Sequence, residues 1–387
     1  MMEKVLICAS RMSHILNFHL PYIQAFKEEG GQVEAAAEGA VRHPLIDRCY
    51  DMRFVKNPFS PENLKTIGQL RQLLRQNHYD LVYSNATLAG AALRMAVKRL
   101  PKRERPRCVH ISHGYMFDTG KDLHSLIYRR VEKHLAKVTD TLVVMNEEDL
   151  FLAQHYHLAK QIVMTNGMGL CTDRFPPITE QERKALRQSL GAEDDTMVML
   201  CVGEFSARKN QSLLIEALNR LPPELLGKVR LVFVGEGTLL EECRLLTQRY
   251  ELQPFVRFFG QVEQPNRYYR SADVLLSAAS MEGLPFNVME ALYCGLPVVA
   301  SRIKGHNDLI THGENGLLFF HQAVNAAAAL AYELQRLMTD KLLYDRLKAY
   351  AFLPEAYLIE QVEPYLFSVL NGRRPAAEIQ IPEVTHP

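Results

Sequence analysis

Apolar and polar positions follow two alternating patterns along nearly the whole chain. Short, largely β-branched apolar runs are typical of buried strands, and the longer stretches between them have the spacing of helices. This alternation predicts an α/β fold of parallel sheets covered by helices. The predicted strands are KVLICA, VEAAA, DLVYSN, CVHIS and TLVVMN in the first half, and MVMLCVG, VRLVFVG, VRFFG, DVLLS and PVVAS in the second. Helices are expected over residues 13–29 and 123–137, and from near Arg208, Thr238, Pro265 and Phe286.

The two series of elements predict two domains. The chain has 387 residues, and domains commonly hold about 100 to 200 residues. The segment TNGMGLCTDRFPPIT has the glycines and prolines of a connector. We therefore expect Rossmann-like, doubly wound domains over 1–175 and 176–353, an amphipathic helix over 354–373 and a tail over 374–387. Two such domains that face each other leave a cleft at the carboxyl ends of their strands, where open α/β sheets bind ligands.

Composition narrows the class of protein. Hydrophobic residues make up 47% and charged residues 23% of the chain, which excludes a fibrous or disordered protein. Seven cysteines occur singly with no Cys-x-x-Cys pair, so the sequence predicts neither a disulfide framework nor a zinc site. We expect no metal and no cofactor. The apolar runs are too short for a membrane span or a signal peptide, so a cytoplasmic location is expected.

The most informative segment is SMEGLPFNVMEALYCGLPVVAS, residues 280–301. Pro285 suits the start of a helix, Gly295 suits its left-handed end, and Pro297 stops its continuation. Glu282 then lies in the loop before the helix and Glu290 about one turn inside it. Backbone N–H groups at a helix start favour a diphosphate, and carboxylates accept hydrogen bonds from sugar hydroxyls. Two glutamates at this spacing alone could equally be solvated surface acids.

The whole segment resembles glycosyltransferase family 4, whose Glu-x7-Glu motif matches Glu282 and Glu290 within EGLP and MEAL. The resemblance implies that Glu290 holds the ribose of a donor nucleotide and that Glu282 lies near the reacting carbon. Gly283, Leu284, Pro285 and Phe286 would complete this part of the donor site. In FFGQV, Gly260 and Val262 would lie against the uracil base.

VGEFSARKNQSLLIEAL also resembles the family, whose members present an arginine and a lysine to the donor diphosphate. Lys209 falls on the lysine, whereas Glu204 stands where most members have the arginine. Either Arg208 replaces that charge or the site has one cation fewer. Without the resemblance, Lys209 could be a solvated loop lysine.

In the first half, CVHISHGYMFDTG places His113 at the end of a strand. It resembles the His-Gly loop of capsule and exopolysaccharide enzymes of the family, which implies that His113 approaches the donor sugar or the acceptor hydroxyl. A structural histidine bonded to the backbone is the alternative. His14 and His19 in the first loop are further acceptor-side candidates, although histidines in such positions are more often packing or surface residues.

The resemblance implies the GT-B fold, with the final helix crossing back onto the first domain, and a hexosyltransferase activity that retains the anomeric configuration. The chain has no Asp-x-Asp, so the donor diphosphate is expected to be stabilised without a metal, by Lys209, Arg208 and the helix start. The expected donor is a UDP-sugar, for example a UDP-N-acetylhexosamine, and the acceptor a lipid-linked or glycan sugar in cell-surface polysaccharide synthesis. Nucleic acid is not an expected partner. A sugar-nucleotide 2-epimerase and a non-catalytic sugar-nucleotide-binding protein remain as alternatives.

One basic segment indicates the cellular location of the protein. Residues 94–107, RMAVKRLPKRERPR, hold seven basic residues and one acid, in a half whose net charge is +6 from 24 basic and 18 acidic residues over 1–175. Such a cluster suits peripheral contact with anionic lipid at the inner membrane face. Lys98, Arg99, Lys102 and Arg103 are the candidate contacts. Alternatively, these cations stabilise the end of a helix.

Overall fold

The computed structural model describes residues 3–55, 57, 60–120 and 122–373. The chain divides into two compact units, and the division falls at Gly169 and Leu170. The predicted tail over 374–387 lies outside the described residues. Among the described residues, unit 2 is Leu170–Leu358, and residues 359–373 belong to unit 1 again. The change of unit thus lies before the expected boundary at Phe175, and the second change lies just after Leu358.

Unit 1 contains a seven-stranded parallel sheet in the order β3-β2-β1-β4-β5-β6-β7. Its central strands are almost completely buried, because helices cover both faces of the sheet. Every neighbouring pair runs parallel, as the alternation of strands and helices predicts. The strands are β1 (Lys4–Arg11), β2 (Gln32–Glu38), β3 (Arg48–Asp51), β4 (Leu81–Asn85), β5 (Arg107–Ile111), β6 (Thr141–Val144) and β7 (Gln161–Met164).

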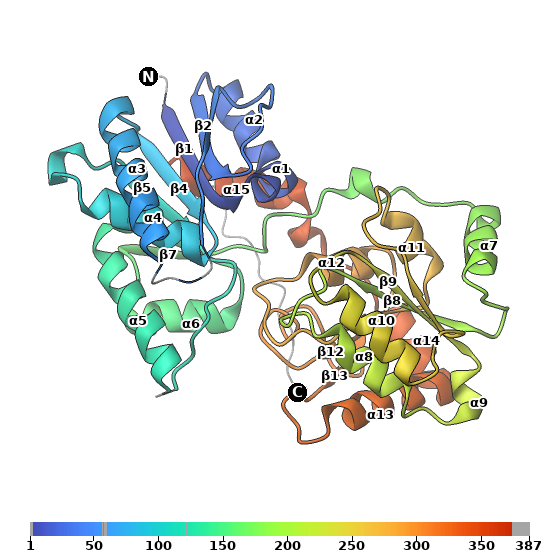
Figure 1. Ribbon diagram of the computed structural model, residues 1–387. Helices are drawn as coiled ribbons and strands as arrows, with labels where there is room; N and C mark the ends of the chain where they lie inside the picture. Colours follow the sequence, from blue (N-terminus) through green and yellow to red (C-terminus); the bar gives the residue numbers. More distant parts are fainter. Residues whose placement is uncertain (1–2, 56, 58–59, 121, 374–387) are drawn as a thin grey trace. The chain divides into compact units, whose positions relative to one another are not determined.

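The helices of unit 1 lie on both faces of this sheet, with α3 and α4 on one side and α2 and α15 on the other (Figure 1). Helix α15 comes from the end of the chain, and it packs on α2 through Phe26 and Phe367, whose ring centroids lie 4.9 Å apart. The helices are α1 (Met12–Phe18), α2 (Leu20–Glu28), α3 (Pro61–Asn77), α4 (Thr87–Lys98), α5 (Leu123–Leu135), α6 (Glu147–Tyr156) and α15 (Ile359–Leu370), with 3-10 turns η1 (Lys102–Glu104) and η2 (Ala136–Val138).

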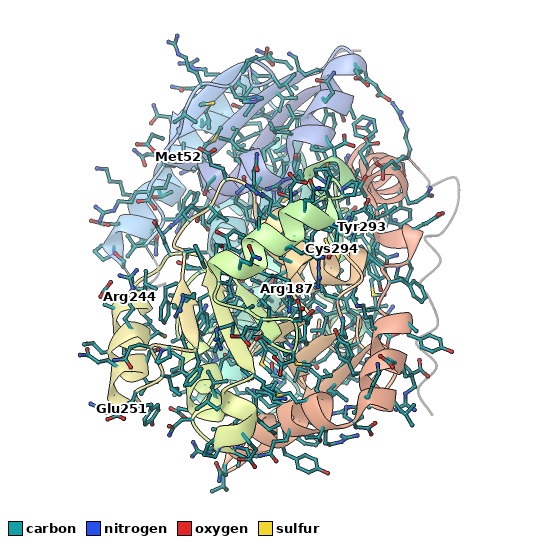
Figure 2. The ribbon with its side chains drawn as sticks, turned by 90° about the vertical axis from the view of Figure 1, so that its right-hand side faces the viewer. Met52, Arg187, Arg244, Glu251, Tyr293 and Cys294 are labelled. Atoms are coloured by element: carbon teal, nitrogen blue, oxygen red, sulfur yellow. The ribbon has the colours of Figure 1, made fainter. Side chains whose placement is uncertain are left out.

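Unit 2 contains a six-stranded parallel sheet in the order β10-β9-β8-β11-β12-β13. Arg187, labelled in Figure 2, lies on α7 and joins this helix to the starts of the central strands β8 and β11. Its guanidinium donates to Asp273 Oδ2 at 2.8 Å and to the Thr196 carbonyl at 2.6 Å. The strands are β8 (Met197–Val202), β9 (Val229–Val234), β10 (Val256–Phe258), β11 (Val274–Ser277), β12 (Val298–Ser301) and β13 (Gly316–Phe319). The helices are α7 (Glu180–Ser189), α8 (Gln211–Leu218), α9 (Pro223–Leu226), α10 (Leu240–Arg249), α11 (Asn266–Ser271), α12 (Phe286–Tyr293), α13 (Ala326–Thr339) and α14 (Lys341–Ala349), with η3 (Thr172–Arg174) and η4 (Glu355–Tyr357).

The helix expected over residues 13–29 is interrupted. It forms two helices, α1 and α2, which meet at His19. Pro21 stands in the first turn of α2, and because proline has no N–H it cannot continue the hydrogen-bond ladder of α1. The break brings His19 to the junction, where its side chain is fully buried.

Candidate donor-binding site

The candidate site lies where the strand order of unit 2 reverses. Strands β8 and β11 are neighbours, and the chain proceeds from β8 to β9 on one side and from β11 to β12 on the other. Such a reversal is the point at which open α/β sheets bind ligands, beyond the carboxyl ends of the strands. Lys209 and Arg208 lie in the loop after β8, and Glu282 lies in the loop after β11. The sheet therefore brings these predicted residues to the same edge.

Glu282 bridges both cations. Its Oε1 accepts from Lys209 Nζ at 2.7 Å and from an Arg208 guanidinium nitrogen at 2.6 Å. The Lys209 and Glu282 side chains are 14% and 10% exposed, whereas Arg208 is 45% exposed. Arg208 thus reaches the carboxylate that Lys209 also contacts, and a second positive charge does lie in this loop although position 204 holds a glutamate.

Burial and the two neighbouring cations together set the pKa of Glu282. Burial by itself raises the pKa of a carboxyl group. For Glu282 burial is the largest single effect, but the charges of Lys209 and Arg208 and the Lys209 hydrogen bond together outweigh it, so the pKa of Glu282 lies below the ordinary value. Glu282 is therefore ionised at neutral pH and carries the counter-charge for the two cations.

The start of α12 is fixed against the same edge. Asn287 in its first turn donates from Nδ2 to the Val202 carbonyl at the end of β8, at 3.1 Å. The Ser280 N–H donates to the Arg208 carbonyl at 2.8 Å, and Arg208 itself donates to the Met281 carbonyl at 3.1 Å. Pro285 stands at the N-cap and provides no side-chain cap for this helix. Two cations and a helix start therefore lie together, which is an arrangement suited to a diphosphate.

Glu290 lies one turn further along α12 and has a different partner. The Tyr269 hydroxyl on α11 donates to Glu290 Oε2 at 2.5 Å. Burial raises the pKa of Glu290, and the Tyr269 hydrogen bond and the nearby charges of Arg174 and Lys209 only partly offset this effect. One carboxylate oxygen of Glu290, Oε2, is thus held by the Tyr269 hydroxyl.

Glycines let the neighbouring loops approach closely. A Cβ on Gly235 would lie 2.1 Å from the Gly203 carbonyl oxygen, and one on Gly305 would lie 2.6 Å from the Gly283 carbonyl oxygen. Both have positive φ, 139° and 79°. Gly260, after β10, accepts from the Gly235 N–H at 2.7 Å and so lies at the same edge of the sheet. Val262 follows Gly260 in the same loop after β10.

Two residues of this region carry no signal in the sequence. Tyr269 lies before β11 in an ordinary helix pattern, and only the fold shows that it holds Glu290. His306 is fully buried in the loop after β12, where Nδ1 donates to the Ser301 carbonyl at 2.7 Å and Nε2 lies 3.0 Å from Ser277 Oγ. Burial lowers the pKa of His306 to about 4. It is a neutral residue that fixes the loop facing Glu282.

The first-half candidates lie in unit 1. His113 follows β5 and His14 is on α1, and their ring centroids are 4.9 Å apart. Burial lowers the pKa of His14 to about 4 and that of His113 to about 3, so both imidazoles are neutral. No backbone hydrogen bond holds Nε2 of His113, which has no partner among the described residues.

In the basic segment over 94–107, some cations make internal contacts and others are exposed. Arg94 is buried and forms a two-pronged ion pair with Glu132, at 2.7 and 2.8 Å. Arg105 donates to the carbonyls of Leu100 and Lys98 at the end of α4, as the helix-end explanation predicts. Arg99, Lys102 and Arg103 are exposed. Lys98 Nζ lies 2.6 Å from His134 Nε2.

Comparisons with known proteins place these observations in a family. The family model "Glycosyltransferase Family 4" matches residues 22–167, and "Glycosyl transferases group 1" matches residues 182–353. The chain is 32% identical over 339 residues to a Bacillus subtilis (strain 168) protein described as "Putative glycosyltransferase EpsD", covering 87% of this chain and 88% of that protein.

A second relative and a solved structure extend the comparison. The Escherichia coli UDP-Gal:alpha-D-GlcNAc-diphosphoundecaprenol alpha-1,3-galactosyltransferase is 27% identical over 328 residues, which are 82% of this chain and 80% of that enzyme. The crystal structure of Anabaena HepE in complex with UDP-glucose has a TM-score of 0.74 at 18% identity, over 95% of this chain and 99% of that one. Among the described residues, no helix is long and apolar enough to cross a membrane.

Proposed function

Because the chain belongs to glycosyltransferase family 4 and transfers sugar from a nucleotide-sugar, we propose that it is a retaining enzyme that needs no Mg²⁺ or Mn²⁺. The observation that carries the proposal is the cluster of Lys209, Arg208 and Glu282 beside the start of α12. Two fixed cations and a helix start supply the positive charge that a bound metal provides in other diphosphate sites. The same membership favours transfer over the 2-epimerase and the non-catalytic binding protein.

The chemistry follows from where the charges lie. In the proposed reaction the bond between the anomeric carbon and the diphosphate oxygen breaks, and Lys209 and Arg208 stabilise the charge on the departing oxygen. The acceptor hydroxyl attacks the same face of the sugar and gives its proton to that oxygen. Glu282 then lies near the reacting carbon, and Glu290 holds the ribose hydroxyls. His113 approaches the donor sugar or the acceptor hydroxyl.

The proposed substrates are a UDP-linked sugar, for example a UDP-N-acetylhexosamine, and a lipid-linked or glycan acceptor in capsule or exopolysaccharide synthesis. The relatives support this choice, since the E. coli enzyme is named for a UDP-sugar and a diphosphoundecaprenol-linked acceptor. In this assignment Gly260 and Val262 flank the uracil, and Gly283 through Phe286 surround the diphosphate and sugar.

A donor screen tests the proposed function. UDP-, GDP- and dTDP-sugars are offered with a diphospholipid-linked sugar acceptor, in buffer without added Mg²⁺ or Mn²⁺. We expect transfer from a UDP-sugar with the anomeric configuration kept, as measured by NMR of the product, and a rate that added Mg²⁺ changes by less than about twofold. An inverted product would contradict retention. A rate that depends on Mg²⁺ or Mn²⁺ would contradict the role given to Lys209 and Arg208.

Four cations at and just after the end of α4 are proposed to contact anionic lipid: Lys98, Arg99, Lys102 and Arg103. Each lysine or arginine close to such a surface contributes about 1 kcal/mol, and salt screens the effect. Neutralising Lys98, Arg99, Lys102 and Arg103 should abolish co-sedimentation with anionic vesicles at low salt. A control variant that neutralises the exposed Lys184, Arg220, Lys228 and Arg249 of unit 2 loses the same net charge and should still bind. Equal loss of vesicle binding in both variants, or equal binding of the parent to neutral vesicles, would contradict the lipid contact. The cations of this segment would then only stabilise the end of α4.

A further inference from the structure

Three histidines of unit 1, two from the segment after β1 and one from the loop after β5, lie together at the carboxyl edge of its sheet. His14 is on α1, His19 lies between α1 and α2, and His113 follows β5. The ring centroid of His14 lies 5.4 Å from that of His19 and 4.9 Å from that of His113. One ring nitrogen from each residue can be chosen such that all three atoms lie within 4.8 Å of one another. The strand order of unit 1 reverses between β1 and β4, so α1 begins at the ligand-binding position of this sheet.

The nitrogens of this histidine cluster lack partners. Nδ1 of His14, both ring nitrogens of His19 and Nε2 of His113 are buried and make no hydrogen bond within the described part of the chain. His19 is completely buried. An unpaired polar group inside a protein costs about 1 to 3 kcal/mol, and such groups are rare enough in folded proteins that each calls for a ligand, an ion or a water. Here four such atoms gather in one place.

We propose that His14, His19 and His113 bind one divalent transition-metal ion of the zinc class. Imidazole nitrogen is a preferred ligand of zinc, and three histidines with an open fourth position form an established type of zinc site. At Zn–N distances of about 2.0 to 2.1 Å, tetrahedral ligands lie roughly 3.4 Å apart. The three nitrogens therefore need to move inward by about 1 Å, which small rotations of the side chains provide.

The ligand set selects the ion. Mg²⁺ and Ca²⁺ bind oxygen ligands, and the cluster offers none, whereas imidazole suits zinc, copper and nickel. The proposed ion differs in kind from the Mg²⁺ or Mn²⁺ that the proposed donor chemistry does without, and because His113 also has a role in the proposed function, the test below measures metal binding rather than transfer. The proposed ion also departs from the sequence prediction of no metal, which rested on cysteine spacing and on the missing Asp-x-Asp.

The ion would join α1, the junction before α2 and the loop after β5. The first two segments are continuous in the chain, and the shortest covalent link from them to the loop after β5 is the chain between His19 and His113. Because a ligand that binds only the folded state stabilises it, zinc should raise the melting temperature of the protein. This effect is a readout that does not involve catalysis.

The test uses the full-length chain without a histidine tag. The purified protein is stripped with chelator and titrated with Zn²⁺, and bound metal is measured by mass spectrometry. We expect one zinc per chain, a higher melting temperature with zinc, and with Co²⁺ the visible absorption of a tetrahedral site. H14Q and H113Q should each weaken zinc binding by about tenfold or more. H124Q changes an exposed histidine of the same unit and should bind zinc like the parent.

Two outcomes would overturn the proposal. One is a stripped, folded parent that binds no zinc at equimolar concentration, in which case the histidine nitrogens are paired by water. The other is equal loss of binding in H124Q and H14Q, which would mean surface binding. Because the decisive measurement is made on the parent protein, a variant that does not fold leaves the test intact.

Discussion

Replacing Lys209 with alanine is expected to lower kcat/KM by roughly 10²- to 10³-fold, which is the typical effect of losing one fixed electrostatic contact with a departing group. Lys209 Nζ is largely buried and lies 2.7 Å from Glu282 Oε1. Its charge is therefore held in place before a donor arrives. The variant should also bind free UDP more weakly, because the diphosphate loses a cation. Initial rates and calorimetric UDP binding measure the two effects.

Lys228→Ala is the matched control for this prediction. Lys228 lies in the same unit and also forms an ion pair, with Asp195 at 3.1 Å, but both side chains are more than half exposed. Exposed ion pairs contribute little, so K228A should keep the rate and UDP affinity of the parent. If K209A stays within a few-fold of K228A, Lys209 does not belong to the donor site.

Glu282→Gln is expected to lower turnover without weakening the binding of free UDP. The substitution keeps the size of the side chain and removes the charge that Lys209 and Arg208 share. Free UDP should bind as well as in the parent or more tightly, because both cations are released from their carboxylate. Turnover should fall by about 10²-fold or more, since the proposed function places this carboxylate next to the reacting carbon. Single-turnover rates and UDP calorimetry measure the split.

Glu241→Gln controls for the loss of a carboxylate. Glu241 is exposed on α10 and pairs with Arg244, so its variant should behave like the parent in both measurements. A Glu282→Gln protein that loses UDP binding would show that Glu282 positions the cations for the diphosphate. One that keeps full turnover would remove Glu282 from the chemistry.

The family and the fold class were predictable from the sequence, and the comparisons confirm both. Three strands, β3, β7 and β13, are not among those predicted, and the first two have a physical reason. Strands β3 and β7 lie at the two edges of the unit 1 sheet, where a strand is paired on one side only and less completely buried. Their sequences, RCYD and QIVM, are short and partly polar. Nine of the ten predicted strands lie inside the two sheets and have the apolar runs from which they were predicted, and the tenth, β10, is an edge strand of unit 2.

Local structure is what the sequence alone determined. The start of α12 at Phe286 was predicted from Pro285, and its end from Gly295, because helix starts and ends depend on residues close together in the chain. The tertiary structure decided which charges meet. In a parallel sheet, the carboxyl ends of strands far apart in sequence come to one edge, so Glu282 contacts Lys209 across 73 positions, and His113 lies beside His14. No spacing rule within one segment encodes such meetings, because they depend on the order of the strands, which long-range packing sets.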